Sequence, residues 1–245
     1  MTDPLAPLLD LVDVAPALVA ARSSVDAALR HRALRRRGGM VAAEVSLRCA
    51  VASSALEGYA FAREDVRAGL VTDPVLQGAL RVAGALGGLV DLWSRAPRQV
   101  LARLHVLAAR DVSPDDTLGR PTGGAPGTPE RLDALAALVT GGTRVPPLLL
   151  AAVVHGELLA LRAFAGPNGV VARAAARLVL MAGGFDPRGL VAMEVGHLAR
   201  QPEYVGAANA FATGTPDGIR SWIRHCATAA ELGARELTEV CDQAA

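Results

Sequence analysis

The sequence predicts an all-α fold on three observations. Apolar residues recur at steps of three and four along most of the chain, which places them on one face of a helix. No run of four or more residues alternates polar and apolar positions as a strand would. Two segments, at Thr128 and Thr215, combine a hydroxyl at the N-cap, a proline and an acidic residue in the order that starts a helix. A usual helix length of about 11 to 12 residues predicts roughly eight to ten helices.

The expected elements follow one another with short breaks. The helical steps are Leu8, Leu11 and Val12; Val25, Leu29 and Leu34; Leu132, Leu135 and Leu138; and Leu178, Met181 and Phe185. Gly-Gly pairs at 38–39, 87–88, 141–142 and 183–184 suit helix ends or close packing. The most apolar run, 145–161, contains His155 and Glu157 and is too short for a membrane span, so it predicts a buried central helix. Residues 113–129 are too rich in proline and glycine for a helix and predict a loop.

Length and composition favour one cytoplasmic domain. A chain of 245 residues, 51% of them hydrophobic, can bury a core of ordinary size. We expect residues 1–39 to form a helical extension that packs as one unit with a helical domain of residues 40–245. Cys49, Cys226 and Cys241 are widely spaced and odd in number, which predicts reduced, buried thiols. The N-terminus carries acidic rather than basic residues, so we expect no signal peptide.

The charged residues exclude several chemistries. All 25 basic residues are arginine, and a chain without lysine has no P-loop lysine, no Schiff-base lysine and no Ser-Lys pair. A net charge of +1 with interleaved signs favours neither nucleic acid nor an anionic membrane as a partner. The exception is the segment 30–37, which contains five arginines and His31. Because no aromatic residues interleave with them, we interpret it as a solvated helix end whose cations suit the helix dipole, in preference to a nucleic-acid site.

The most informative segment is 160–180, ALRAFAGPNGVVARAAARLVL, in which a glycine-rich turn opens a new helix. Free backbone N–H groups and the positive end of the helix dipole meet at such a turn, where an anion can bind. The segment resembles the motif of the Fic (Fido) family of AMP-transferases, His-x-Phe-x-(Asp or Glu)-Gly-Asn-Gly-Arg-x-x-Arg. The resemblance implies a Fic-like helical bundle, and an anion- or nucleotide-binding role for the residues retained here. These are Phe164, Asn168, Gly169 and Arg173.

Four functional positions of the motif differ. The resemblance implies that the motif His takes a proton from the target's hydroxyl, but the guanidinium of Arg162 cannot accept one. Gly166 offers no carboxylate where the family coordinates Mg²⁺, and Pro167 has no N–H where the first glycine helps bind the anion. Val170 replaces an arginine that binds phosphate. The sequence therefore predicts a degenerate site with no catalytic residue, no bound metal and no cofactor.

A second match lies upstream of this motif. Ser53, Glu57 and Gly58 resemble the inhibitory motif of Fic proteins, (Ser or Thr)-x-x-x-Glu-(Gly or Asn). The resemblance implies that the glutamate pairs with the second arginine of the motif, here Arg173, and obstructs the γ-phosphate. We predict an ion pair between Glu57 and Arg173 that holds the N-terminal helix over the nucleotide pocket. The alternative is that the two charges are exposed and unrelated.

Other signals are weaker. Gly119-Arg120 loosely matches the element that precedes the Fic flap, but glycine, proline and threonine fill the place of its strands, so we expect a shortened or missing β-hairpin flap. His155 lies seven residues before Arg162, roughly 10 Å along a helix, and is expected to make a structural hydrogen bond. Glu194 and His197 have the spacing of di-iron ligands without a second pair, so we expect surface residues on one helical face.

These observations predict a catalytically degenerate Fic-like protein that acts as a non-enzymatic interaction or regulatory module. One alternative is an anion or nucleotide sensor, in which Arg162 and Arg173 hold a phosphate and Glu57 competes for Arg173. Another is a residual AMP-transferase, and an enzyme of different chemistry in the same pocket ranks last. The expected partners are an unidentified protein, a phosphate or nucleotide, and a second copy of the chain.

Overall fold

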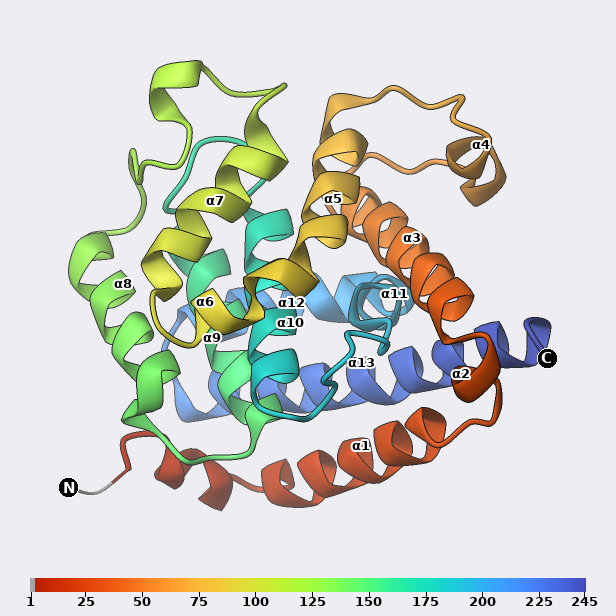
Figure 1. The fold of residues 1–245 in the computed structure, drawn as a ribbon. Coiled ribbons are helices and arrows are strands. Elements are labelled where there is room, and N and C mark those ends of the chain that lie inside the picture. The colour runs from red at the N-terminus through yellow and green to blue at the C-terminus, as the bar shows by residue number, and fades with distance from the viewer. Residues whose placement is uncertain (1–2) are drawn as a thin grey trace.

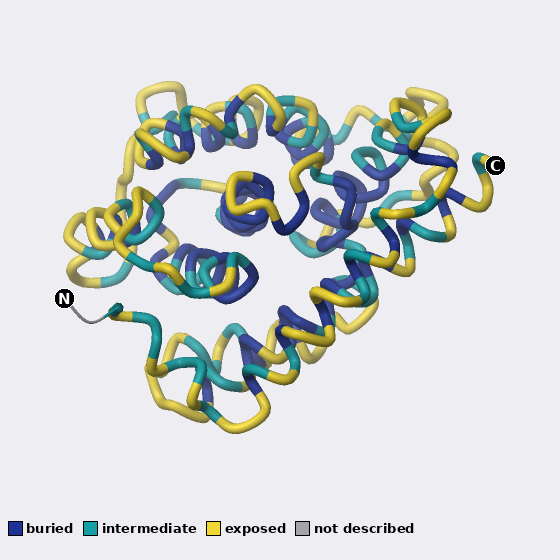
Figure 2. Tube along the Cα trace, turned by 60° about the horizontal axis from the view of Figure 1, so that its bottom comes forward, coloured by how far each residue is buried: buried dark blue, intermediate teal, exposed yellow. Residues whose placement is uncertain are grey.

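Two apolar helices, α9 (Pro147–Leu161) and α10 (Asn168–Ala182), form the centre of the computed structural model, which describes residues 3–245. Every residue of α10 from Gly169 to Met181 is buried, because other helices cover it on all sides. Figure 2 shows the buried helices enclosed by helices whose outer faces are exposed. The prediction that 145–161 forms a buried central helix is confirmed by α9.

The longest helix, α13 (Pro216–Gln243), lies along α1 (Val14–Leu29) and forms one side of the bundle (Figure 1). Thr215 caps α13 as predicted, since its hydroxyl accepts a hydrogen bond from the Gly218 amide. Val14 and Leu18 of α1 belong to the same hydrophobic core as the central helices. The N-terminal segment therefore packs against the rest of the bundle through a shared core.

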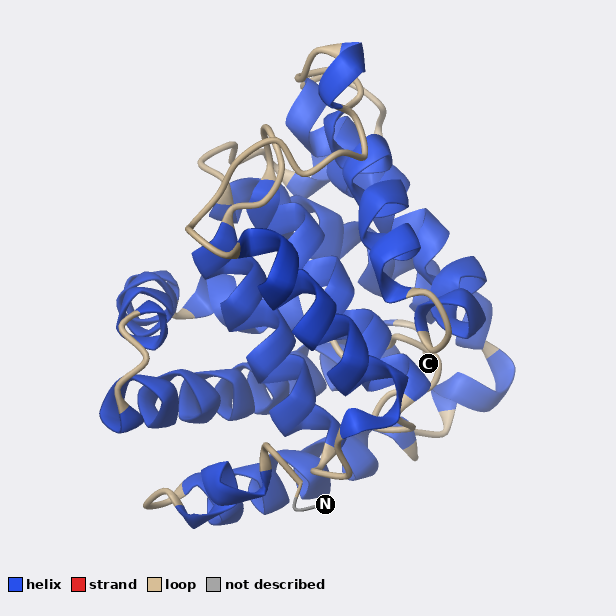
Figure 3. Ribbon diagram, turned by 90° about the vertical axis from the view of Figure 1, so that its left-hand side faces the viewer, coloured by secondary structure: helices blue, strands red, loops and turns tan. Residues whose placement is uncertain are grey.

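The remaining helices pack around α9 and α10 or against their neighbours. They are α2 (Ala33–Arg36), α3 (Gly38–Leu56), α4 (Arg63–Arg67), α5 (Pro74–Ala85), α6 (Val90–Trp93), α7 (Pro97–Ala109), α8 (Thr128–Ala137), α11 (Met193–Ala199) and α12 (Gln201–Ala212). Among them, α4 packs against α3, and α2 packs against α3 and α13. Short 3₁₀ or π turns occupy Ala6–Asp10, Leu86–Leu89, Asp115–Thr117 and Leu138–Gly142. Residues 3–245 contain no strand (Figure 3), so the all-α prediction and the missing flap strands are confirmed.

Three details of the sequence prediction are wrong. The described residues form thirteen α-helices rather than eight to ten, because several elements are single turns. Thr128 is the first residue of α8 and not its N-cap, which is Gly127 at a φ of 74°. Gly38 and Gly39 begin α3 instead of ending the preceding helix. At none of these positions does the local sequence distinguish the expected structure from the observed one.

Two stretches are long and apolar enough to cross a membrane by length and composition alone. They are Gly38–Leu56 and the continuous helical stretch Pro74–Trp93. Both pack within the bundle, where 50% and 39% of the tested windows are buried. Core helices meet the same criterion, so these stretches are weak evidence for a membrane span.

Candidate functional site

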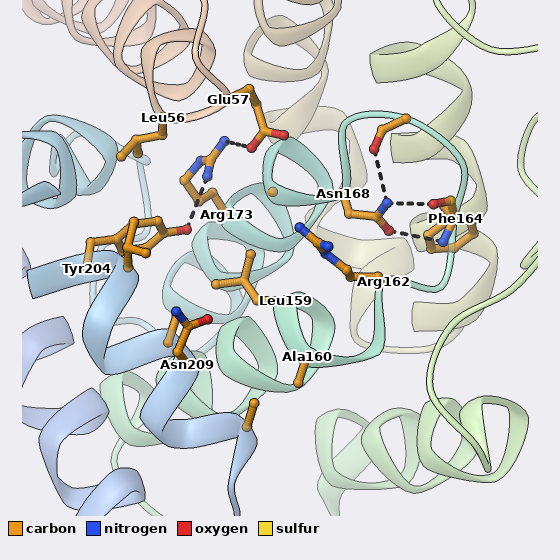
Figure 4. A pocket seen from close by; sticks show the side chains of 15 residues that line it. Leu56, Glu57, Leu159, Ala160, Arg162, Phe164, Asn168, Arg173, Tyr204 and Asn209 are labelled. Carbon is orange, nitrogen blue, oxygen red and sulfur yellow. Dashed lines mark hydrogen bonds and ion pairs between the residues drawn. The ribbon is translucent and has the colours of Figure 1, made fainter. Parts of the chain in front are cut away.

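A pocket of about 780 Å³ lies where the C-terminal end of α3, the turn between α9 and α10, and α12 come together. The predicted residues Glu57, Arg162, Phe164, Asn168 and Arg173 line it, as do Gly166 and Gly169 (Figure 4). Segments more than 100 residues apart in the sequence therefore form one site. Leu159, Val205 and Ala208 contribute an apolar wall.

Asn168 closes the turn between the two central helices. Its side-chain oxygen accepts a hydrogen bond from the Phe164 amide at 3.0 Å, and its nitrogen donates to the carbonyls of Phe164 and Gly166. These bonds satisfy backbone N–H and C=O groups that have no helical partner between α9 and α10. The Asn168 side chain thus fixes the shape of the turn, and its predicted contact with an anion stays a prediction.

His105 of α7 supports the same turn, a role that no sequence pattern predicts. Its ring stacks on Phe164 with centroids 4.8 Å apart. Its Nδ1 accepts a hydrogen bond from the Gly119 amide at 3.0 Å, so its Nε2 donates to the Ala165 carbonyl at 2.6 Å. Burial lowers the pKa of His105, although the bond to Ala165 opposes that shift. Because both ring nitrogens are bonded to the backbone, His105 positions the loop.

Arg173 is the most highly bonded side chain of the pocket. It donates to the Ser53 hydroxyl at 3.0 Å and to the Ser53 carbonyl at 2.9 Å, and it forms an ion pair with Glu57 at 2.8 Å. Its third partner is the Tyr204 hydroxyl at 3.1 Å. The Arg173 side chain is 2% exposed and that of Glu57 is 21% exposed, so the ion pair lies at the edge of the core. Glu57 and Arg173 are therefore paired, as predicted, and are not separate surface charges.

The bonds continue inward from Arg173 to His155. Since Tyr204 accepts from Arg173, its own hydroxyl hydrogen can donate to His155 Nε2 at 3.1 Å. Burial lowers the pKa of His155 well below its usual value, and the positive charge of Arg173 and the nearby His225 lower it further. Burial acts against the charge of Arg173, but Tyr204 and Glu57 outweigh it and raise the pKa of that guanidinium. His155 thus makes the structural hydrogen bond predicted for it.

Glu57 reaches the pocket because it is the C-cap of α3, which ends at Leu56. Gly58, at a φ of 96°, donates to the Ala55 carbonyl, and the Tyr59 amide donates to the Ser54 carbonyl. These two bonds form a Schellman motif, in which the left-handed residue is commonly glycine. The Glu57 carboxylate lies over Gly169, where a Cβ would be only 2.0 Å from Glu57 Oε1. A carboxylate at the first turn of α10 is stabilised by the helix dipole.

Arg162 ends α9 in the left-handed region, at φ 47° and ψ 46°, which is uncommon for a residue with a Cβ. The loop between α7 and α8 fixes the backbone on both sides of it. The Thr122 amide donates to the Ala163 carbonyl and the Ala125 amide donates to the Leu161 carbonyl, both at 3.1 Å. The exposed guanidinium of Arg162 extends toward the centre of the pocket (Figure 4). It forms no ion pair within residues 3–245.

Two of the other three altered motif positions do not suit a metal or a phosphate. Gly166 has a φ of 78°, and a Cβ there would lie 2.7 Å from the Ser113 hydroxyl, so an acidic side chain does not fit without rearrangement. Val170 is buried and faces an interior cavity beside Cys49 instead of the pocket. The described residues contain no group of three or more His, Cys, Asp or Glu side chains placed to hold a metal ion. These residues do not fit the magnesium site that the Fic motif implies.

The predicted surface position of one neighbouring cluster is wrong. Glu194 and His197, expected on the surface, are 4% and 1% exposed. His197 Nδ1 lies 3.0 Å from His225 Nε2, and Glu194 faces Arg177 at 3.7 Å. Their burial follows from the packing of α11 against α3 and α13, which a single helical face does not indicate.

Comparison with known proteins places this all-helical architecture among proteins with a Fic domain. No family model matches the sequence, and no curated protein matches it. A solved structure of a Fic family protein from Desulfovibrio desulfuricans G20 is similar with a TM-score of 0.72 and 22% identity, over 91% of this chain and 74% of that one.

Fic-1 (residues 134–508) from C. elegans is similar with a TM-score of 0.74 and 18% identity, over 98% of this chain and 76% of that one. A glutamate-to-glycine variant of the same protein is similar with a TM-score of 0.73 and 20% identity, over 96% of this chain and 74% of that one. The chain therefore has the Fic fold.

Proposed function

We propose that this Fic-fold chain is a non-enzymatic protein that acts as an interaction or regulatory module. The observation that carries the proposal is the content of the pocket. Arg162 stands where the family motif has its proton acceptor, and Glu57 already pairs with Arg173 at the start of α10. A guanidinium cannot accept a proton in a protein, and removal of a general base typically lowers a rate about 10²- to 10⁴-fold.

The imidazoles near the pocket support this proposal. His105 makes two backbone hydrogen bonds, and His155 is buried behind Tyr204. Neither ring is placed to accept a proton from a group bound beside Arg162. The Glu57 carboxylate, which lines the pocket, is held by Arg173.

The test is AMP transfer. The purified chain and its Glu57→Gly variant are incubated with a cell lysate and with ATP labelled at the α-phosphate, with and without Mg²⁺. We expect no labelled protein beyond those seen with lysate alone, for either chain. Label that depends on this chain, and above all label that increases with Glu57→Gly, would show a residual AMP-transferase and overturn the proposal.

The second candidate function is an anion or nucleotide sensor, favoured by the free guanidinium of Arg162 and by Arg173 beside the first turn of α10. Isothermal calorimetry with ATP, AMP and phosphate, with and without Mg²⁺, separates the two functions. Millimolar or tighter binding that strengthens in Glu57→Gly would favour the sensor. If Glu57 keeps Arg173 from an anion, the unsubstituted chain should give no heat of binding.

A further inference from the structure

A second charged surface lies away from the pocket, where α1 passes into α3. Five arginines between residues 30 and 37, which we call the arginine turn, are all exposed. They are Arg30, Arg32, Arg35, Arg36 and Arg37. Between them, Ala33 and Leu34 are buried and fix the segment to the bundle. The cations are thus presented by an anchored part of the fold.

The arginines of the turn differ from most other arginines of the molecule because they are not paired with acidic side chains. Thirteen of the chain's 25 arginines form an ion pair with an acidic side chain. Within residues 3–245, none of the five arginines of the turn does so; His31 Nε2 shares a hydrogen bond with the Asp242 carboxylate at 3.1 Å. Five of the chain's unpaired arginines are therefore gathered in eight residues.

The helix dipole accounts for part of this cluster. Arg30 is the C-cap of α1, and Arg35 and Arg36 lie in the last turn of α2, where the helix-end interpretation places cations. Arg32 and Arg37 are the N-caps of α2 and α3, where the dipole opposes a cation. Like charges spaced three or four residues apart, as at Arg32, Arg35 and Arg36, repel one another in a helix. The cluster therefore disfavours the isolated fold slightly.

The surface is concave. Arg32, Arg35, Arg36 and Arg37 line a hollow of about 490 Å³ together with Ala33 and Ala245. Four guanidinium groups can thus approach one ligand from several sides. Each guanidinium can hold a carboxylate with two parallel hydrogen bonds.

We propose that the arginine turn is a docking site for an acidic segment of a partner protein, a run of aspartate or glutamate residues. This inference rests on the proposed function, because it names the chemistry of the partner of an interaction module. A short acidic segment matches the size of the hollow, and its carboxylates supply the counter-charges that the fold does not.

A duplex nucleic acid fits this surface less well. The helix α2 is about 6 Å long and cannot fill a groove. Residues 30–40 contain no Phe, Tyr or Trp side chain that could stack on a base. The formal net charge is +1, so the molecule outside the five arginines carries −4 and repels a polyanion that extends beyond the turn.

The arginine turn and the pocket can be tested separately. The turn precedes α3, and Glu57 follows it, so the 19 residues of α3 separate the two by about 28 Å. Substitutions in the turn leave the ion pair of Glu57 and Arg173 intact.

The experiment measures fluorescence anisotropy of a labelled peptide of eight glutamates in about 50 mM salt. The variant Arg35→Gln/Arg36→Gln/Arg37→Gln is compared with Arg95→Gln/Arg103→Gln/Arg235→Gln, which removes three exposed arginines elsewhere. We expect the dissociation constant to rise at least about tenfold in the first variant and less than about twofold in the second. A thermal melt of each variant verifies that it is folded.

Three results would overturn the proposal. The unsubstituted chain binds no peptide, or both variants lose affinity equally, or a 12-base-pair duplex or phosphatidylserine vesicles bind the turn more tightly than the peptide does. If the peptide binds and AMP labelling depends on the chain, the proposed function is overturned and the docking site stands. If the peptide does not bind and no AMP labelling is seen, the docking site is overturned and the proposed function stands.

Discussion

At the scale of single residues, the position of Glu57 depends on the absence of a side chain at Gly169. A Cβ on Gly169 would lie 2.0 Å from Glu57 Oε1 and 2.8 Å from Arg173 Nη1. No real Cβ approaches an oxygen so closely, so any larger residue must displace the carboxylate. Gly169 therefore has a specific role, although a glycine near a helix start ordinarily indicates backbone freedom.

We expect the loss of stability caused by Gly169→Ala to depend on the residue at position 57. In the unsubstituted chain, the alanine displaces Glu57 from Arg173 and should lower the free energy of unfolding by about 2 kcal/mol, the typical cost of a hydrogen bond to a charged group. In the Glu57→Gly background the loss should be smaller, because the alanine then meets only Arg173 Nη1, at 2.8 Å, and its higher helix propensity offsets up to about 1 kcal/mol of the cost. Urea denaturation of the unsubstituted chain, of each single variant and of the double variant measures the coupling between positions 57 and 169.

The matched control is Gly39→Ala. Gly39 is the second residue of α3, as Gly169 is of α10, and a Cβ there meets nothing within 4 Å. The effect of Gly39→Ala on the free energy of unfolding should not depend on the residue at position 57. Equal effects of Gly169→Ala in both backgrounds would mean that the carboxylate does not occupy the position over Gly169.

At the scale of elements, the loop between α7 and α8 takes the place in which the Fic resemblance implies a flap. Its residues Thr122 and Ala125 bond to the backbone on either side of Arg162. Gly124, at φ 113°, lies between them, and a Cβ there would be 2.5 Å from the Leu161 carbonyl. The close approach of loop and turn thus requires glycine at this position.

Gly124→Ala should release this loop from the turn. The substitution combines a steric clash with a φ that alanine rarely adopts, a strain of about 1 to 3 kcal/mol. Hydrogen–deuterium exchange should become about tenfold faster or more at the amides of Thr122 and Ala125. The adjacent Gly123→Ala is the control, because nothing lies within 4 Å of a Cβ there. Equal exchange in both variants would show that the two backbone bonds do not hold the loop.

Elements with strong local signals were predictable, and those set by tertiary contacts were not. The apolar run of α9 and the cap at Thr215 depend on nearby residues. The short helices α2 and α4 have no periodic stretch of their own, and ion pairs such as Arg67 to Glu44 hold α4 against α3. His105 supports the turn from about 60 residues away, and no local pattern reports such a contact.

At the scale of the whole molecule, helices α9, α11, α12 and α13 meet in a cluster of rings behind the pocket. His155, His197, His225, Tyr204 and Trp222 lie within 4.9 to 6.3 Å of one another in most pairs. The Trp222 indole donates to the Ala152 carbonyl at 2.7 Å. Because Arg173 bonds to Tyr204, the pocket is coupled to this part of the core.

Burial keeps the three imidazoles of the cluster neutral. It lowers the pKa of His155 and of His197 well below the usual value, and it lowers that of His225 to about 4. His197 and His225 share one hydrogen bond between ring nitrogens, in which one nitrogen donates and the other accepts. Protonation of both rings would place two donors face to face.

The stability of the fold should therefore decrease in mild acid. The unfolded histidines bind protons below about pH 6.5, whereas folded His225 does so only near pH 4, so the unfolded state holds more protons in this interval. The free energy of unfolding should fall as the pH is lowered from 7 to 4.5. His225→Gln keeps a partner for His197 but does not titrate, so its curve should fall less steeply, by up to about 1.4 kcal/mol per pH unit. Urea denaturation across this range measures both slopes, with values at pH 7.5 as the common reference. Identical slopes in the two chains would show that His225 is not held neutral by burial.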